Sequence, residues 1–529
     1  MTNHPGEPAR PSESSIAASA AVISMGNVTS RALGLLREVA ISHYFGATGA
    51  VSAFRVASRT YNLLYELLVG GMLSSVLVPT LARVSGPHQE RDFERVLGAL
   101  VGNLGLLAAL ATGGLAVFAP ELVSIMGKGF GRDLQELAAS LMRTTAPAVF
   151  LMSLAGIVAA ALYARAAFFW PSFMAAAFNC GIIAAVITLS KPLGLPALAL
   201  GVVLGAAWQL CLQLAGARRV GFRLHPAWHY DPEVRQAFRL AAPVLLSLLV
   251  GQAQVVLDSY FASQTGERSL AWMASATTLV QLPLGLVATA VSLASLPELA
   301  RAWHGSNSHQ ETYGSVLGFS LRLVIVLILP ATALLAVLAV PTVDLLFEHG
   351  QFARTDTFAT ARALMVYCLG LPFAAVDQCL ILASYARADT LRPAAVGLAA
   401  TGIYLAAAMG TMRRFGMLGL VLANSLQWLF HAVVMSWVTL RKHALPQEER
   451  VAIGRSCLRA VPSSAICAAA AALVLAGLPT KPGLGWEALR LLLPGVTGAA
   501  LYLLCMHALQ SSEVRALESL ALAKVCARR

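Results

Sequence analysis

Residues 163–171 are Tyr163-Ala164-Arg165-Ala166-Ala167-Phe168-Phe169-Trp170-Pro171, and residues 385–393 repeat the pattern as Tyr385-Ala386-Arg387-Ala388-Asp389-Thr390-Leu391-Arg392-Pro393. Other echoes keep nearly the same offset. They pair Pro79–Arg83 with Pro297–Arg301, Ser42–Phe45 with Asp258–Phe261, and Pro120–Phe130 with Pro341–Phe352. The chain therefore contains two copies of one unit followed by an unmatched tail. In a membrane protein this organisation is typical of a transporter whose site lies between the two halves.

Composition indicates a polytopic membrane protein. The 529 residues are 57% hydrophobic and only 12% charged, with a mean hydropathy of +0.70. A soluble chain carries about 25% charged residues. Apolar runs of roughly 20 residues, each long enough to span a bilayer, follow one another along the chain. We therefore expect an all-α fold.

About fourteen transmembrane helices are predicted, in two pseudo-symmetric lobes of six and a C-terminal helix pair. The predicted domains are a disordered cytoplasmic N-terminus (1–16), an N-lobe (17–219), a C-lobe (220–441), the helix pair (442–510) and a cytoplasmic tail (511–529). Asp231-Pro232 is typical of an N-cap followed by the first residue of a helix. An even number of spans per copy relates the halves by an axis along the membrane normal.

The net charge of +12 does not indicate nucleic-acid binding, because the basic residues are scattered over the ends of the spans. Loops on one face carry about twice as many Lys and Arg as loops on the other, which places both termini in the cytoplasm. None of the eight cysteines forms a metal-binding spacing. We expect no cofactor and no metal.

The first two spans contain charges that are costly in a membrane. Span 1 carries Arg31, Arg37 and Glu38, and span 2 carries Arg55, Arg59, Asn62 and Glu66. The four positions in span 2 follow i, i+4, i+7 and i+11, which is one face of a helix. Each buried ion costs about 2.5–3.5 kcal/mol on insertion scales, so these faces should line a wet, cationic cavity.

Arginine suits a large anion, because its planar fork binds phosphate oxygens through two parallel hydrogen bonds. A headgroup that carries phosphate is the expected ligand. Alternatively, Arg37, Arg55 and Glu66 extend to the interface or form structural ion pairs. In the second half, Asp258 is a candidate ion or proton site, or a carboxylate that caps the outer end of the cavity.

The chain resembles the MurJ/MviN family of the multidrug/oligosaccharidyl-lipid/polysaccharide exporter superfamily. Several stretches carry the resemblance: Ser30–Glu38, Tyr44–Ala47, Asn62–Leu64, Val78–Pro79, Arg143–Pro147, Pro171–Phe173, Asp258–Ser263, Phe347–Phe352 and Tyr385–Pro393. The resemblance implies fourteen helices in two lobes and a C-terminal pair that holds a lipid tail. It also implies a lipid II flippase, active in peptidoglycan synthesis at the bacterial cytoplasmic membrane.

The same resemblance assigns the diphosphate of the substrate to Arg31, Arg37 and Arg59, with Asn62 orienting the diphosphate or the sugar. Glu38, Arg55 and Glu66 would line the cavity with Thr278. The family normally carries Ala-Asp-Arg-Leu in span 8, whereas this chain has Ala276-Thr277-Thr278-Leu279. Thr278 thus stands where the family places an arginine.

We therefore expect a transporter, not an enzyme, that flips polyprenyl-diphosphate-linked lipid II from the inner to the outer leaflet. Membrane potential, Na⁺ or H⁺ would drive it, and peptidoglycan-synthesis proteins are the expected partners. Two alternatives remain: an exporter of another polyprenyl-linked glycan, and a divergent, non-transporting scaffold for envelope synthesis.

Overall fold

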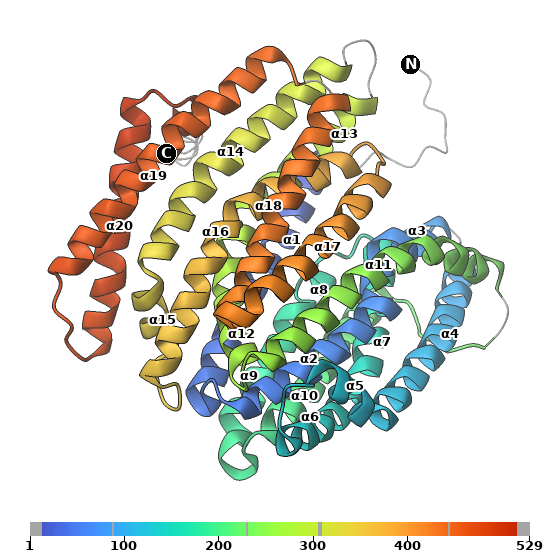
Figure 1. The fold of residues 1–529 in the computed structure, drawn as a ribbon. Helices are drawn as coiled ribbons and strands as arrows, with labels where there is room; N and C mark the ends of the chain where they lie inside the picture. Colours follow the sequence, from blue (N-terminus) through green and yellow to red (C-terminus); the bar gives the residue numbers. More distant parts are fainter. Residues whose placement is uncertain (1–12, 87–88, 229–230, 305–308, 443–444, 516–529) are drawn as a thin grey trace, which may run out of the picture. The chain divides into compact units, whose positions relative to one another are not determined.

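The computed structural model describes residues 13–86, 89–228, 231–304, 309–442 and 445–515. These residues are mostly helical and contain no β-strand, which confirms the predicted all-α class (Figure 1). Residues 1–12 of the predicted disordered N-terminus and residues 516–529 of the predicted tail lie outside the described residues. Two compact units are present. The first comprises residues up to Ile41 together with Ala53–Val256, and the second comprises Ser42–Ser52 together with Leu257 onward.

The first unit contains the helices of the first sequence repeat and most of α11, the helix that opens the second repeat. Their bounds are α1 (Glu13–Phe45), α2 (Gly49–Leu68), the short turns η1 (Gly70–Met72) and η2 (Leu73–Leu77), α3 (Val78–Arg83), α4 (Glu90–Val117), α5 (Ala119–Met126), α6 (Arg132–Thr145), α7 (Pro147–Ala164), α8 (Phe169–Ser172), α9 (Met174–Leu193), α10 (Pro196–Val220) and α11 (Pro232–Gln264). Helix α10 packs on both α9 and α7, and α7 also packs on α4. The tip of α1, the start of α2 and the end of α11 belong to the second unit.

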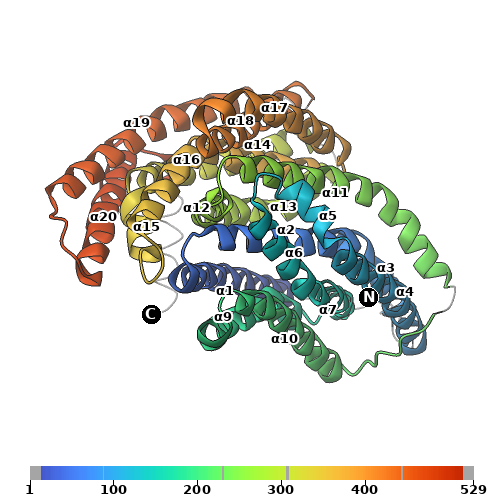
Figure 2. The same cartoon turned by 60° about the horizontal axis from the view of Figure 1, so that its bottom comes forward.

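The second unit repeats this succession and adds the C-terminal pair. Its bounds are α12 (Ser269–Pro283), η3 (Leu284–Thr289), α13 (Ala290–His304), α14 (His309–Val337), α15 (Ala339–Phe347), α16 (Arg354–Tyr385), α17 (Leu391–Phe415), α18 (Met417–Lys442), α19 (Gln447–Gly477) and α20 (Leu484–Ala508). Helix α16 packs on both α14 and α18. Helix α19 packs on α14 and on α20, and Figure 2 shows α19 and α20 side by side.

Within the described residues, twelve helical segments are long and apolar enough to cross a membrane. They include every predicted span except those in α1 and α11, so fourteen spans remain a prediction. The predicted N-cap is confirmed: Asp231 Oδ1 accepts a hydrogen bond from the Glu233 N–H at 2.9 Å, and α11 begins at Pro232. The apolar segment Arg132–Ala164 is divided at Pro147, which starts a new helix because proline cannot donate the next backbone hydrogen bond.

The repeated motif adopts the same turn in both halves. Ala166 and Ala388 each have a φ of 56°, the left-handed conformation that ends many helices. In the first half, the N–H of Ala167 bonds to the carbonyl of Leu162 at 2.8 Å. In the second, the N–H of Asp389 bonds to the carbonyl of Ser384 at 3.1 Å. Both are the six-to-one bond of a Schellman motif.

The arginines of the repeated motif also have equivalent surroundings. The Arg165 guanidinium lies 4.2 Å from the centre of the Phe93 ring at the start of α4. The Arg387 guanidinium lies 5.4 Å from the centre of the Tyr313 ring at the start of α14. These cation–π contacts place a basic residue at one end of each helix bundle.

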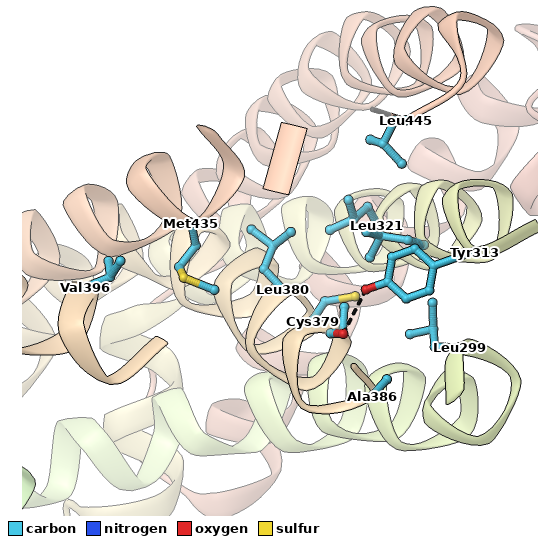
Figure 3. Close-up of a cluster of buried hydrophobic side chains, with 11 residues drawn as sticks. Leu299, Tyr313, Leu321, Cys379, Leu380, Ala386, Val396, Met435 and Leu445 are labelled. Carbon is cyan, nitrogen blue, oxygen red and sulfur yellow. Dashed lines mark hydrogen bonds between the residues drawn. The ribbon is translucent and has the colours of Figure 1, made fainter. Parts of the chain in front are cut away.

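A buried cluster around Tyr313 holds the second unit together near this turn. Leu299, Tyr313, Cys379, Leu380 and Met435 pack here from α13, α14, α16 and α18. Figure 3 shows the Tyr313 hydroxyl, which donates to the Ala383 carbonyl at 2.8 Å. A buried tyrosine needs such a partner because an unpaired hydroxyl in an apolar core is costly.

A basic cavity in the first unit

A cavity of about 150 Å³ lies among α1, α2 and α9 within the first unit. It is lined by Arg37, Ile41, Phe54, Arg55, Ser58, Arg59, Tyr61, Asn62 and Ile182. Three of these nine side chains are arginines and none is acidic. At about 30 Å³ per water molecule, the space corresponds to about five waters, so it fits a compact anion.

Helix periodicity explains why α2 supplies most of the polar lining. Arg55, Arg59 and Asn62 occur at i, i+4 and i+7, and the helix turns them to one side. Arg37 reaches the same space from α1. Glu66, at i+11 on α2, is half-buried and does not line this cavity. The structure thus brings four of the predicted residues together.

Glu38 forms an ion pair with Arg55. The carboxylate oxygen Oε1 accepts from Nη2 of Arg55. The Glu38 side chain is 1% exposed and the Arg55 side chain 12% exposed. The structural ion pair that the sequence offered as an alternative for Arg55 is therefore present. With Glu38 paired in this way, the formal charge of Arg37, Arg55, Arg59 and Glu38 is +3 − 1 = +2.

Asn179 positions Arg37, and sequence reasoning missed it. Arg37 Nη1 donates to Asn179 Oδ1 at 2.9 Å, and Asn179 Nδ2 donates to the carbonyl of Ser30 at 3.3 Å. The asparagine thereby ties α9 to two turns of α1. The one available signal was a buried amide within the otherwise apolar segment of α9.

Two guanidinium nitrogens at the cavity are buried without a hydrogen-bond acceptor. They are Nε of Arg37 and Nε of Arg55, and no acceptor for either is present among the residues that the structure describes. Buried donors in native proteins are nearly always satisfied by protein or by a bound group. This pair of donors is therefore suited to oxygen atoms of a ligand or of water.

Arg31 and Asn62, two of the residues predicted to bind the headgroup, differ in position. Arg31 is half-buried on α1 and is not among the lining residues. Asn62 donates through Nδ2 to the carbonyl of Ser58 at 2.9 Å, which leaves its Oδ1 directed away from that bond.

Asp258 and Thr278 belong to the second unit. Asp258 Oδ1 accepts from the hydroxyl of Tyr404 at 2.9 Å, a partner on α17 that the sequence did not indicate. Thr278 donates through Oγ1 to the carbonyl of Ala274 on its own helix at 3.0 Å. Across the part of the chain that the structure describes, no group of three His, Cys, Asp or Glu side chains is placed to hold a metal ion.

The profile of a known family matches this chain over most of its length. The family model described as lipid II flippase MurJ matches residues 41–487. The chain belongs to the MurJ family. A MurJ relative from Haemophilus influenzae, named probable lipid II flippase MurJ, is 30% identical over 70% of this chain and 76% of its own length.

Solved structures agree with the MurJ fold. A structure of lipid II flippase MurJ in an inward closed conformation aligns with a TM-score of 0.77 at 21% identity, covering 91% of this chain and 97% of that chain. An inward-facing multidrug resistance MATE transporter of the MOP superfamily aligns with a TM-score of 0.68 at 14% identity, covering 80% and 98%. The chain thus has the fold of this transporter superfamily.

Proposed function

We propose that this chain is a flippase that carries lipid II, a polyprenyl-diphosphate-linked peptidoglycan precursor, from the inner to the outer leaflet of a bacterial cytoplasmic membrane. Membership of the MurJ family supports this proposal. The observation that carries it is the cavity of the first unit, where Arg37, Arg55 and Arg59 meet.

The chemistry of that cavity suits a diphosphate. A guanidinium stays charged in an apolar setting and binds phosphate oxygens in a bidentate way. Arg37 and Arg59 would hold the diphosphate, with Arg31 at the approach and Asn62 turned to the phosphate or the first sugar. The cavity is small, at about 150 Å³, so the diphosphate would enter it and the sugars and the peptide would lie outside it.

The remaining parts of the chain would move and guide the lipid. Rocking of one lobe against the other would give alternating access, and the α19–α20 pair would guide the polyprenyl tail along its apolar surface. Asp258, held by Tyr404, would bind a coupling ion or proton. Membrane potential also contributes, at about 2.3 kcal/mol per charge per 100 mV. No covalent bond changes, so the activity is transport and not catalysis.

Complementation tests the roles of the arginines. Arg31→Ala, Arg37→Ala and Arg59→Ala should each abolish growth rescue of a strain depleted of its own flippase, at unchanged membrane levels of the protein. Arg413→Ala serves as the control, because Arg413 lies at the exposed end of α17 and its loss should leave rescue intact. Full rescue by Arg37→Ala together with Arg59→Ala would exclude the proposed binding site.

A non-transporting scaffold is the second candidate, and Thr278 favours it. Where the family pattern has an arginine, this threonine uses its hydroxyl to bond its own helix backbone. If the chain is a decayed transporter, Thr278→Arg should raise lipid II flipping in reconstituted vesicles from background to a measurable rate. Strong flipping by the unaltered chain would exclude the scaffold.

A further inference from the structure

An aspartate and a histidine form a buried pair inside the second unit. His431 Nδ1 on α18 lies 2.6 Å from Asp377 Oδ1 on α16. The two side chains are 11% and 12% exposed. Both helices are apolar enough to span a membrane. Ionisable groups at such positions are costly to insert and usually mark ion or proton pathways.

The distance fixes the minimum number of protons on the pair. A nitrogen and an oxygen 2.6 Å apart need a hydrogen between them, because two lone pairs would repel at that separation. With one proton the pair is a neutral imidazole whose Nδ1–H donates to a carboxylate, and its net charge is −1. A second proton, added at Nε2 of His431 or at Oδ2 of Asp377, makes the pair neutral overall. Burial disfavours the charged form, so this site is built to accept one proton.

A cavity in the second unit reaches the Asp377 side chain. Its volume is about 510 Å³, and Asp377 is the only ionisable side chain that lines it within the described residues. Gln281, Thr289 and Gln378 supply the neutral polar lining. Gln378 Nε2 donates to Thr289 Oγ1 at 2.9 Å. At about 30 Å³ each, on the order of ten waters fit, which is enough to carry a proton to the carboxylate.

The groups that face the pair from neighbouring helices are mostly neutral. Gly397 of α17 lies beside His431 Nε2, and Trp428 of α18 lines the cavity. Tyr385 lies two turns further along α16 itself, and its phenol is neutral at physiological pH.

Helix α14 also packs on α16, and its Tyr313 and Arg322 side chains are engaged elsewhere. Tyr313 bonds the carbonyl of Ala383, and Arg322 pairs with Glu449 and Glu513. At the outer end of α16, Asp344 of α15 pairs with Arg354, and Asp356 pairs with Arg268. Within the described residues, no salt bridge joins a cationic side chain other than His431 to Asp377.

We propose that Asp377 and His431 form a proton-binding site, loaded through the cavity, whose occupancy couples lipid transport to the proton gradient. The coupling rests on the proposed flippase function. A proton fits better than Na⁺, because Oδ1 of Asp377 already faces the imidazole and a metal ion there would meet an N–H. Loading changes the charge between α16 and α18 by one unit, which biases how closely the two helices pack.

The first experiment measures titration directly and needs no transport. The full chain, labelled with ¹⁵N-histidine and reconstituted in lipid nanodiscs, is followed by nitrogen NMR from pH 4 to 9. The resonance of one histidine should shift with pH while its ring N–H stays protected from rapid exchange with bulk water. The midpoint of that shift should move in Asp377→Asn, and the resonance itself should be absent in His431→Gln. His507→Gln, which removes an exposed histidine of α20, is the control. A His431 signal that keeps one protonation state throughout would overturn the proposal.

The second experiment measures coupling, with a fluorescent lipid II analogue in vesicles that contain the purified protein. A gradient of one pH unit at zero membrane potential should change the outward-to-inward ratio of the probe by up to about tenfold per proton. Asp377→Asn and His431→Gln should lose this response and keep the response to membrane potential. A pH response that survives in both variants, or a response to a Na⁺ gradient instead, would overturn the assignment.

The two experiments separate the possible failures. If the unaltered chain moves no probe under any gradient, the flippase function fails and proton coupling fails with it, whereas a titrating pair still establishes the proton site. If the chain flips under membrane potential alone and the pair does not titrate, only the inference about Asp377 and His431 fails. The NMR titration of the unaltered chain remains decisive if the variants do not fold.

Discussion

Glu38 and Arg55 illustrate how a costly residue is accommodated at a membrane-embedded site. The carboxylate is 1% exposed and faces a guanidinium that also lines the basic cavity. Glu38 therefore neutralises one of the three arginines that line the cavity. Removing one member of a buried ion pair leaves the other uncompensated, which costs more than the pair itself contributes.

Glu38→Ala should destabilise the protein by about 3–5 kcal/mol because it leaves Arg55 buried without its partner. Thermal and denaturant unfolding in detergent would measure this loss. The double variant Glu38→Ala/Arg55→Ala should recover part of it. Asp92→Ala breaks an exposed pair with Arg95 and should cost about 0–1 kcal/mol. Equal losses for Glu38→Ala and Asp92→Ala would contradict the burial argument.

Helix periodicity was sufficient to predict which residues of α2 share a face. Arg55, Arg59 and Asn62 do line one cavity, although their roles in binding remain predictions. Asn179 and Tyr404 could not be found in this way, because each meets its partner only through the packing of distant helices. A pattern of 3.6 residues fixes a face of one helix and carries no information on which helix covers that face.

At the scale of elements, glycines allow α9 and α10 of the first unit to pack closely. A Cβ at Gly205 of α10 would lie 2.5 Å from the carbonyl oxygen of Phe178 on α9, and one at Gly181 would lie 2.4 Å from the Cα of Gly205. The small-residue pattern at Gly201 and Gly205 is typical of membrane helix packing, and α9 and α10 do pack together here.

Gly205→Val should force α9 and α10 apart and reduce the yield of folded protein, with a cost of about 1–3 kcal/mol or more. The neighbouring atoms are backbone, so they cannot rotate away. Fluorescence size-exclusion chromatography in detergent measures the folded fraction. Gly113→Val is the matched control, because a Cβ there meets nothing within 4 Å. Similar elution profiles for both variants would exclude a steric role for Gly205.

The C-terminal helix pair is fastened to α14 by charge. Arg322 lies 3.0 Å from Glu513 Oε1 and 3.2 Å from Glu449 Oε2. Burial alone would raise the pKa of Glu513, but hydrogen bonds from Ser511, its own backbone and Ser456, together with Arg322, hold it below its ordinary value of 4.5. Folding therefore favours the ionised form of this carboxylate.

Because the pKa of Glu513 is lower in the folded state than in the unfolded state, its ionised form stabilises the fold above about pH 4.5, and that stabilisation disappears as the pH falls further. The melting temperature of the full chain should drop on acidification below this value. Glu513→Gln should lower the melting temperature at pH 7 and flatten its acid dependence. An unchanged acid slope in Glu513→Gln would show that other carboxylates dominate.

Irregular helical turns escaped prediction, because apolar runs have no local signature for them. Spans 2 and 8 each contain a π-helical turn, η2 (Leu73–Leu77) and η3 (Leu284–Thr289), shortly before Pro79 and Pro297. Such turns often occur at functional positions. Their presence in matching spans strengthens the internal repeat that the Tyr-Ala-Arg-Ala motif indicated.

For the whole molecule, the charge distribution predicts orientation. Lys481 lies in the loop between α19 and α20, and Arg219 lies at the end of α10. The predicted spans put these two positions on opposite faces of the membrane. The positive-inside rule places Arg219 in the cytoplasm and Lys481 outside. The repeat itself constrains this choice, because an even number of spans per lobe gives both lobes the same orientation.

Lys481→Cys, in a chain whose reactive cysteines are replaced, should react with a membrane-impermeant maleimide in intact cells. Arg219→Cys should react only after the membrane is opened. A mass tag attached to the maleimide-labelled cysteine shifts the protein band on a gel, and this shift measures the labelling of each variant. The reverse labelling pattern would invert the proposed topology, and with it the leaflet from which lipid II is taken.

The short segment 42–52 affects the order in which the chain can fold during synthesis. It joins α1 to α2, yet it is part of the second unit, where the carbonyl of His43 accepts from the Gln351 N–H at 2.9 Å and Ser52 Oγ accepts from the Ala271 N–H at 3.2 Å. During synthesis this hairpin tip leaves the ribosome long before residues 257–529 exist to receive it. Half-proteins cut between α10 and α11 would each lack a part of one unit, so the tip stays without these hydrogen bonds until Ala271 and Gln351 have been synthesised.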